Sequence, residues 1–528
     1  MRPSRPSFSR LATSGPSRRT VLLGLLASGC TAEAPALQGG WVGTHPERGH
    51  RLRGELPRAD GPLKKTGVLI VGAGIAGLAC ARELARRGVD DFAVLDLEDQ
   101  AGGNSRGHNL GGSPCPLGAH YLPVPGAEAR EVNQLLHELG LAREQLGRTV
   151  WDERYLCHSP QERLFIDGEW RDGLLPPPEH AASLDQYRRF SALVTQAQRD
   201  LGFAMPSHRA RWTPGHAALD GQTFAAWLAR EGLDDTRLRW YLDYCCRDDF
   251  GAGAETVSAW AGLHYFASRH GFHAPGDEAG EREPVLTWAE GNGWLSAQIA
   301  APVQQRIHLG RTVLRVTEER EGVELQAWNE AADKPERWSA RAVVMATPLF
   351  ISARLLSRPH DALRTLKQPH APWLTANLSL REALLPRPGA PASWDNVRYG
   401  TAALGYVDAR HQSRDPTPRA PLLTAYFALP EAQRGELLKQ PWQHWAQMVT
   451  QELAQTHPDL PGKLERIDLC RFGHAMSIPI PGLRGSVELA ALNAQRGRVV
   501  FAHSDLAGYS VFEEAYTAGV EAAARLSL

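Results

Sequence analysis

A glycine-rich turn after a short apolar run is the feature that most limits how this chain can fold. Gly72, Gly74 and Gly77 form the pattern G-x-G-x-x-G directly after the apolar run 68–71. The first glycine permits a sharp turn, the second lets a diphosphate approach the backbone, and the third lets a helix pack closely against the strand. Free N–H groups at the beginning of that helix, which would include Ile75 and Ala76, attract phosphate. The pattern therefore predicts a strand–turn–helix unit that binds a dinucleotide.

The residues after the next apolar run, 92–95, decide between two dinucleotides. Asp96 ends this run, and a carboxylate there accepts hydrogen bonds from ribose hydroxyls. The following loop contains a second glycine pair, which an NAD site does not need and which resembles the flavoprotein pattern. The loop therefore predicts FAD, and Arg106 could pair with a phosphate oxygen or remain a solvated loop arginine. The candidate cofactor residues of this loop are Leu97, Gly102, Gly103, Asn104 and Arg106.

Four later segments, in order along the chain, resemble the flavin amine oxidase superfamily. They are 118–121 (GAHY), 290–295 (EGNGWL), 346–348 (ATP) and 498–519, a closing strand, loop and helix. The resemblance places the first segment against the flavin ring, the third beside the cofactor and the last at the diphosphate and the flavin's pyrimidine edge. It implies cofactor contacts from Gly118, Ala119, His120, Val313, Ala346, Thr347, Pro348, Asp505, Val511 and Phe512.

The resemblance and the order of the segments predict an α/β fold of the amine oxidase and glutathione reductase type. A discontinuous, Rossmann-like FAD-binding domain would be joined to an α+β substrate domain. Hydrophobic spacing predicts helices at 127–144, 181–201, 223–231, 235–244 and 255–270. The expected boundaries are 1–35 for an export signal, 36–65 for a tether, 66–125, 283–350 and 466–528 for the FAD-binding domain, and 126–282 (mostly helical) and 351–465 for the substrate domain.

The candidate catalytic residues include departures from the superfamily. His120 could accept a proton or donate to a substrate, or be a structural histidine, and His474 precedes the closing strand. Arg354 stands near the place where many members have a lysine, and an arginine cannot act as a base at ordinary pH. Val511 stands where the family has a cage tyrosine, so Tyr509 is the nearby aromatic candidate.

Two polar and aromatic stretches are further candidates for the substrate site. The first, 240–249 (WYLDYCCRDD), places Asp243 and Arg247 four residues apart, as a helical ion pair would be. Asp248 or Asp249 could be structural or could receive a cationic substrate. The second stretch is 394–400 (WDNVRYG).

The first 35 residues predict export. Arg18 and Arg19 precede a short apolar run, which resembles a twin-arginine signal, and the run is too short to span a bilayer. Cys30 lies in an imperfect lipoprotein box, so lipidation of Cys30 and attachment to a membrane remain open beside ordinary cleavage. We expect a periplasmic or envelope-anchored protein that is exported in its folded form.

We expect an FAD-dependent oxidoreductase that transfers a hydride from an amine C–H to the flavin, with reoxidation by oxygen or another acceptor. The alternatives are a flavin-dependent desaturase or isomerase of an apolar substrate, or a non-catalytic FAD-binding envelope protein. A net charge of −1 over 528 residues gives no broad basic face for nucleic acid. None of the seven cysteines has metal-ligand spacing, so no metal is expected. The sequence does not define the oligomeric state.

Overall fold

The computed structural model describes residues 37–55, 57, 61–269, 271–277, 284–417 and 419–526. The predicted export signal and Cys30 lie outside these residues. Nearly all described residues belong to one compact unit, Gly39–Leu528. Within the described ranges, no helix combines the length and the apolar character that a bilayer crossing needs.

A five-stranded parallel sheet brings together segments that are far apart in the sequence. Its order is β13 (Ile307–His308), β4 (Phe92–Leu95), β3 (Val68–Val71), β17 (Ala342–Met345) and β23 (Val499–Phe501). All residues of β3, β4, β17 and β23 are buried, as their continuous apolar sequence predicts for strands that are covered on both faces. The beginning, the middle and the end of the chain therefore meet in one sheet.

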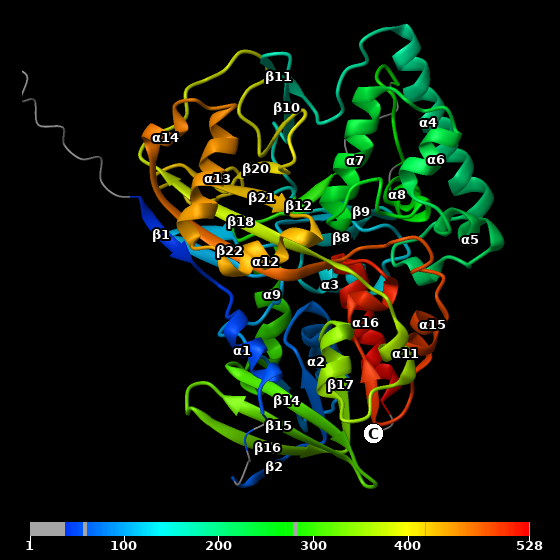
Figure 1. The fold of residues 1–528 in the computed structure, drawn as a ribbon, viewed down its shortest axis with the longest axis vertical. Helices are drawn as coiled ribbons and strands as arrows, with labels where there is room; N and C mark the ends of the chain where they lie inside the picture. Colours follow the sequence, from blue (N-terminus) through cyan, green and yellow to red (C-terminus); the bar gives the residue numbers. More distant parts are fainter. Residues whose placement is uncertain are drawn as a thin grey trace, which may run out of the picture. The chain divides into compact units, whose positions relative to one another are not determined.

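Helices cover one face of this sheet. Figure 1 shows α2 (Ile75–Arg86) and α16 (Phe512–Arg525) side by side, with α9 (Gly293–Ala300) and α3 (Arg130–Glu138) beside them. The contact between α2 and α16 is close: a Cβ atom at Gly519 would lie 2.1 Å from the carbonyl oxygen of Ala76. The first and the last segments of the chain are thus fixed to each other through backbone contact.

A second, four-stranded sheet packs on the opposite side of the parallel sheet. It joins β14 (Arg311–Glu318), β15 (Val323–Asn329), β16 (Lys334–Ala340) and β2 (Leu63–Lys65). Its apolar residues form one buried cluster with residues of β3, β4, β17 and β23. Two short helices, α10 (Leu349–Leu355) and α11 (Asp361–Thr365), follow β17 and complete this layer.

An eight-stranded mixed sheet forms the upper layer in Figure 1. Its order is β1-β22-β18-β21-β20-β19-β10-β11. Helices α12 (Arg434–Lys439) and α13 (Trp442–Ala454) bury apolar side chains against one face, with α14 (Leu460–Lys463) following them. The strand bounds are β1 Gln38–Trp41, β10 Glu162–Ile166, β11 Glu169–Asp172, β18 His370–Leu380, β19 Asp395–Arg398, β20 Gly405–Asp408, β21 Leu422–Ala428 and β22 Leu464–Ser477.

A block of helices packs against the other face of the eight-stranded sheet. Its core contains the buried rings Phe190, Phe224 and Phe250 together with Val397 and Tyr426 of the sheet. The helices are α4 (Ala181–Leu201), α5 (Pro214–Asp220), α6 (Phe224–Arg230), α7 (Thr236–Phe250) and α8 (Ala259–Ala267).

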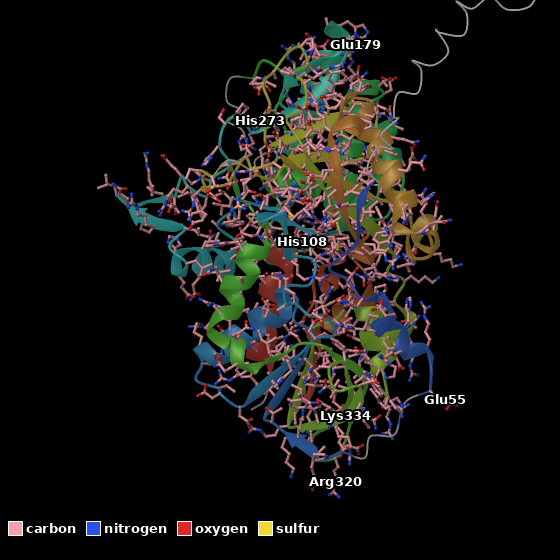
Figure 2. The ribbon with its side chains drawn as sticks, turned by 90° about the vertical axis from the view of Figure 1, so that its left-hand side faces the viewer. Glu55, His108, Glu179, His273, Arg320 and Lys334 are labelled. Atoms are coloured by element: carbon pink, nitrogen blue, oxygen red, sulfur yellow. The ribbon has the colours of Figure 1, made fainter. Side chains whose placement is uncertain are left out.

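A hairpin links the parallel sheet to the upper layer. It consists of β5 (Gly107–Leu110) and β6 (Ser113–Pro116), and His108 Nε2 lies 3.0 Å from Asp468 Oδ2 on β22. Figure 2 shows His108 between the end of the molecule marked by Arg320 and Lys334 and the end marked by Glu179. A site that spans both layers can therefore form near this hairpin.

The structure corrects the predicted bounds of several elements. The helix predicted at 127–144 ends as α3 at Glu138, because Gly140 has a φ of +74° and residues Ala142–Gln145 pair as β8 with β9 (Arg148–Trp151). The helix predicted at 235–244 continues to Phe250, and the one predicted at 255–270 begins only after Ser258, whose Oγ accepts the N–H of Ala261. The helix predicted at 181–201 is confirmed as α4.

The segment 36–65, which the sequence predicts to be a tether, contains regular secondary structure in much of its described part. The segment contains β1, the helix α1 (Pro46–His50) and β2. Val42 N–H donates to the carbonyl of Leu469, and β2 pairs with β16. These pieces are ordered by addition to sheet edges, which a short segment without hydrophobic periodicity does not reveal. The boundaries of the two domains stay predictions.

Replacing Gly519 by alanine tests the close packing of α16 on α2. The added methyl group would overlap the Ala76 carbonyl, so we expect Gly519→Ala to lower the free energy of unfolding by about 1–3 kcal/mol. The matched control is Gly435→Ala in the exposed helix α12, where the methyl group meets nothing within 4 Å and stability should be unchanged or slightly higher. Chemical denaturation measures both. Equal stabilities of the two variants would contradict this packing.

Candidate FAD and substrate site

The turn between β3 and α2 is shaped by backbone contact. Gly72 has a φ of +105°, and a Cβ atom there would lie 2.6 Å from the carbonyl oxygen of Ala346. A Cβ atom at Gly77 would lie 1.9 Å from the carbonyl oxygen of Gly72. Only glycine fits at either position. The backbone of the turn is therefore in direct contact with the 346–348 segment that follows β17.

The second glycine loop lies against the same turn. Gly102 N–H donates to the carbonyl of Ala73 (2.7 Å), and Gly74 and Gly102 form an isolated parallel bridge. The helix α2 begins with Gly74 as its N-cap and has no side-chain hydrogen bond at that end. The first-turn amides of Ile75 and Ala76 are therefore left without a capping side chain, as a diphosphate-binding turn requires.

Asp96 is held in place at the end of β4. Its Oδ2 accepts the N–H of Ala73 (2.6 Å) and its Oδ1 accepts the N–H of Glu98 (2.8 Å). Burial raises the pKa of Asp96, and these two backbone hydrogen bonds act in the opposite direction. Each oxygen keeps a further lone pair that can accept a hydrogen bond from a ribose hydroxyl.

Arg106 is buried and already has protein partners. It donates to the carbonyls of Gly103 (2.7 Å) and Gly43, and its Nη1 lies 3.7 Å from Glu98 Oε2. Its predicted contact with a phosphate stays a prediction. Leu97 is half-buried at the same strand end, and Val313 is buried on β14, next to the β-bulge in that strand.

The closing segment contributes a buried carboxylate. Asp505 is fully buried, its Oδ2 accepts the N–H of Leu349 (2.9 Å), and His370 Nε2 lies 3.1 Å from the same oxygen. Burial raises the pKa of Asp505, but His503 and His370 hold it well below its usual range. Pro348 is the N-cap residue of α10 and Thr347 Oγ1 contacts Ser352 Oγ. The helix predicted in the closing segment is present as α16, which begins at Phe512 after its N-cap residue Val511 and has no side-chain cap.

These residues fit FAD. Two glycine turns, an uncapped helix beginning and a carboxylate at the end of β4 surround one edge of the parallel sheet. This is the donor and acceptor set that a dinucleotide needs.

The chain then passes from this edge to a group of aromatic side chains. Ala119 N–H donates to the carbonyl of Asn104 (2.9 Å), which places the next residue, His120, close to the second glycine loop. The His120 ring stacks on Tyr426 of β21, with centroids 4.3 Å apart, and lies 5.5 Å from Trp394. Burial lowers the pKa of His120 to about 3, so its imidazole is neutral at ordinary pH.

Two carboxylates lie next to these rings. Tyr121 donates its hydroxyl to Asp248 Oδ2 on α7 (3.2 Å), and Asp395 follows Trp394 at the beginning of β19. Burial, together with the charge of Asp249, raises the pKa of Asp248 to about 6. Burial, Glu162 and Asp248 raise the pKa of Asp395 well above its usual range. We call the group His120, Tyr121, Asp248, Trp394, Asp395 and Tyr426 the aromatic–acidic box.

The other polar residues of α7 are structural. Arg247 Nε lies 2.9 Å from Asp243 Oδ2, so the helical ion pair expected from the sequence is present. Asp249 Oδ1 lies 3.1 Å from Arg269 Nη2. Of the two aspartates that the sequence left open, Asp249 is therefore neutralised, whereas Asp248 contacts the box.

Three predicted catalytic residues lie outside the aromatic–acidic box. Arg354 is exposed on α10, and His474 is exposed on β22 with its ring 4.6 Å from that of Phe350. Tyr509 is buried just before the start of α16, and its hydroxyl donates to Glu514 Oε1 of that helix (2.6 Å). Their catalytic roles stay predictions. Tyr426 is not recognisable from the sequence, because it is one of two aromatic residues in the buried strand β21 and belongs to no motif.

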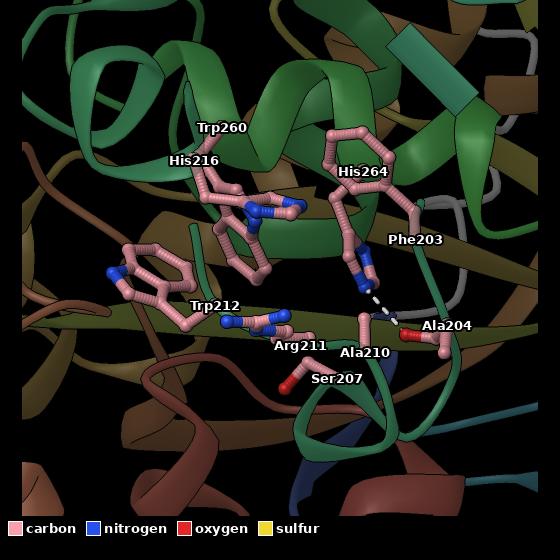
Figure 3. A pocket seen from close by; sticks show the side chains of 9 residues that line it. All are labelled: Phe203, Ala204, Ser207, Ala210, Arg211, Trp212, His216, Trp260 and His264. Atoms are coloured by element: carbon pink, nitrogen blue, oxygen red, sulfur yellow. Dashed lines mark hydrogen bonds between the residues drawn. The ribbon is translucent and has the colours of Figure 1, made fainter. Parts of the chain in front are cut away.

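A small pocket in the helical block is not part of this site. Figure 3 shows it lined by His216, His264, Trp212 and Trp260, with the hydrogen bond from His264 Nε2 to the carbonyl of Ala204 (3.0 Å). His216 Nε2 is likewise 2.9 Å from the carbonyl of Gly202. The side chains of both histidines of this pocket hydrogen-bond to backbone carbonyls, which accounts for their burial.

Comparison with known proteins identifies the family. The family model for flavin containing amine oxidoreductase matches residues 75–527. The chain belongs to this family. FAD is the cofactor of this flavin amine oxidoreductase, in agreement with the glycine turns and Asp96.

The relatives of this flavin amine oxidoreductase are distant. An L-amino acid dehydrogenase from Synechocystis is 24% identical over 300 residues, 56% of this chain and 59% of that protein. Putrescine oxidase, solved with bound putrescine, has a TM-score of 0.63 at 18% identity and covers 88% of this chain and 99% of its own. A fatty acid isomerase from P. acnes has a TM-score of 0.61 at 16% identity, with 88% and 99% covered. These structures show a shared fold.

The raised pKa of Asp248 predicts a stability change that depends on pH. The pKa of this carboxyl group is about 3.9 in the unfolded chain and rises to about 6 on folding. At pH values above about 3.9 the folded state is therefore destabilised, because the carboxyl group loses its proton less readily there than in the unfolded chain. Asp248→Asn keeps a partner for Tyr121 and removes the charge. We expect it to stabilise the substrate-free protein at pH 8, by on the order of 1–3 kcal/mol, with no gain below about pH 4. Denaturation at both pH values measures this. A loss of stability at pH 8 would contradict the assignment.

Proposed function

We propose that this protein is an FAD-dependent oxidoreductase that removes a hydride from the carbon next to an amine nitrogen, with oxygen or another acceptor reoxidising the flavin. Family membership and the fold shared with putrescine oxidase support the proposal. The observation that carries it is the contact between the second glycine loop and the 119–120 segment, which joins the cofactor turns to the aromatic–acidic box.

The residues of the box suit an amine. When bound, FAD supplies the hydride acceptor. His120 is neutral and so does not repel a cationic substrate, and the stacked rings of His120 and Tyr426 form an apolar wall that excludes water. Asp248, whose pKa is about 6, carries a negative charge at higher pH, and this charge favours entry of a protonated amine. Arg354 is exposed and always charged, so it cannot take the proton that the amine must lose.

One observation favours a second function. By its resemblance to the family, the sequence has Val511 where a cage tyrosine is expected, and the fold is shared with a fatty acid isomerase. A desaturase or isomerase of an apolar substrate would use such an apolar residue. It would, however, bring an apolar chain against Asp248 and Asp395, which is unfavourable.

Anaerobic reduction of the flavin separates these functions. We expect a set of primary amines to bleach the flavin absorbance of the purified holoenzyme, and peroxide to form when oxygen is admitted if oxygen is the acceptor. Bleaching, or product formation, with a lipid extract but with no amine would support the desaturase or isomerase. A flavin that neither amines nor extracts reduce, with no product formed, would support a non-catalytic FAD-binding protein.

We also propose that the protein is exported in its folded form, which allows the cofactor to bind before translocation. The support is the sequence of residues 1–35 alone. Replacing Arg18 and Arg19 together by lysine should keep the protein in the cytoplasm, and Cys30→Ser should release exported protein from the membrane if Cys30 is lipidated. Cell fractionation with immunoblotting measures both. Unchanged export of the double lysine variant would contradict the twin-arginine route.

A further inference from the structure

The two carboxylates of the aromatic–acidic box form no ion pair with any residue that the structure describes. Within the described residues, no ion pair joins Asp248 or Asp395 to a lysine, arginine or histidine; Asp248 has the hydroxyl of Tyr121. The two carboxylates meet through the stacked rings: Tyr121 bonds Asp248 and contacts the rings of His120 and Trp394, Asp395 follows Trp394, and His120 stacks on Tyr426. Asp248 also raises the pKa of Asp395. Two like charges in a desolvated place are unfavourable unless a cation joins them.

The nearby arginines are engaged elsewhere. Arg247 binds Asp243 and the carbonyls of Thr401 and Ala402. Arg269 binds Asp249. The charges of both arginines lower the pKa of Asp248, but moving either one into an ion pair with it would leave another carboxylate unpaired, so neither of these two described arginines supplies the missing partner.

Tyr426 gives an independent sign of a missing ligand. Its side chain is 4% exposed and its hydroxyl has no hydrogen-bond partner among the described residues. Its ring stacks on His120, and its pKa is raised well above its usual value by burial, with Asp395 and Asp248 adding to the effect. A buried hydroxyl without a partner costs about 1–3 kcal/mol, which a bound polar group would recover.

The aromatic rings complete a cation site. Tyr121 lies 5.9 Å from Trp394 in a near-perpendicular arrangement, and both adjoin a carboxylate. The faces of tyrosine and tryptophan attract ammonium groups, and more so when water is excluded. Neutral His120 adds no competing positive charge.

The reacting nitrogen itself is a poor partner for two carboxylates. Amine oxidation requires the nitrogen lone pair, so the reacting amine must lose its proton. Two adjacent carboxylates would hold that proton, because they stabilise the ammonium form. The cation that suits this box is therefore a different group of the substrate.

We propose that Asp248, Asp395 and Tyr426 bind a second ammonium group of the substrate, so that the preferred substrates are amines with a distant positive charge. This inference rests on the proposed amine oxidation. The same carboxylates repel a substrate carboxylate, so the box selects against amino acids whose carboxylate would occupy this position.

Three probes of equal chain length test the selectivity in anaerobic flavin reduction by the holoenzyme. We expect 1,5-diaminopentane to reduce the flavin at least 10-fold more efficiently than 1-aminopentane. We expect 5-aminopentanoate, in which a carboxylate replaces the distant ammonium group, to be the poorest of the three. Equal efficiency for the first two probes would overturn the inference.

Variants then assign the effect to the box. Asp248→Asn and Asp395→Asn should each lower the efficiency with 1,5-diaminopentane by about 10- to 100-fold, the usual value of a charged hydrogen bond, and change that with 1-aminopentane only a few-fold. Tyr426→Phe should have a smaller effect of the same kind. The control is Asp408→Asn on the neighbouring strand β20, whose Oδ1 accepts the N–H of Arg410 and which should keep the wild-type ratio. An equal loss for both substrates at full flavin content would show a structural role and overturn the inference.

A binding measurement separates this inference from the proposed function. The holoenzyme with its flavin reduced anaerobically cannot accept a hydride, so 1,5-diaminopentane, a dication at neutral pH, can bind to it without reacting. Calorimetry should detect its binding to the reduced holoenzyme, and Asp395→Asn should weaken that binding at least 10-fold. If no amine reduces the flavin and the dication binds, the proposed function fails and the cation site stands. If amines reduce the flavin and the dication does not bind, the cation site fails and the proposed function stands.

Discussion

The structure depends on the contact between the backbone of the first glycine turn and the segment that follows β17. Gly72, Gly77 and Ala346 approach so closely that no side chain fits between them. This contact fixes where α2 begins, and with it the position of the uncapped amides in the first turn of that helix. The closing helix α16 is fixed to α2 by a similar approach at Gly519. Three distant parts of the chain are thus held at one edge of the parallel sheet.

The same arrangement positions the substrate side. The loop with Gly102 and Gly103 contacts the first turn, and its neighbour Asn104 accepts a hydrogen bond from Ala119. From there the chain leads to His120 and Tyr121, which meet residues of α7, β19 and β21. The cofactor-binding turns and the aromatic–acidic box are therefore parts of one continuous set of contacts. An acid-rich box that is joined to the cofactor-binding turns suits a substrate that reacts at one end and is recognised at the other.

The sequence predicted the elements whose structure depends on residues within the same helix or turn. The strand–turn–helix around Gly72, the long helix α4 and the closing helix α16 follow from glycine positions and from apolar spacing, because these features act within one element. The prediction failed where tertiary contacts decide, as at β1 and β2, which are ordered by the edges of larger sheets. It also failed at the end of α3, where Gly140 with a positive φ allows the chain to turn into β8.

The substrate site was less accessible from sequence for the same reason. Asp248, Asp395 and Tyr426 come from three elements with no common motif, and Asp248 and Asp249 are neighbours in sequence with different partners. Only packing shows that Arg269 neutralises one of them. By contrast, the cofactor-binding turns lie mostly in one segment, so the spacing of their glycines is enough to predict the dinucleotide site.

The central claim is that one FAD is held where the three segments meet. Titration of the apoprotein with FAD, followed by the quenching of flavin fluorescence, tests it most directly. The account predicts saturation at one FAD per chain, and a much weaker affinity for Gly77→Ala, because the added methyl group would displace the turn that receives the diphosphate. An apoprotein that remains folded and shows no saturable binding of FAD would contradict the account.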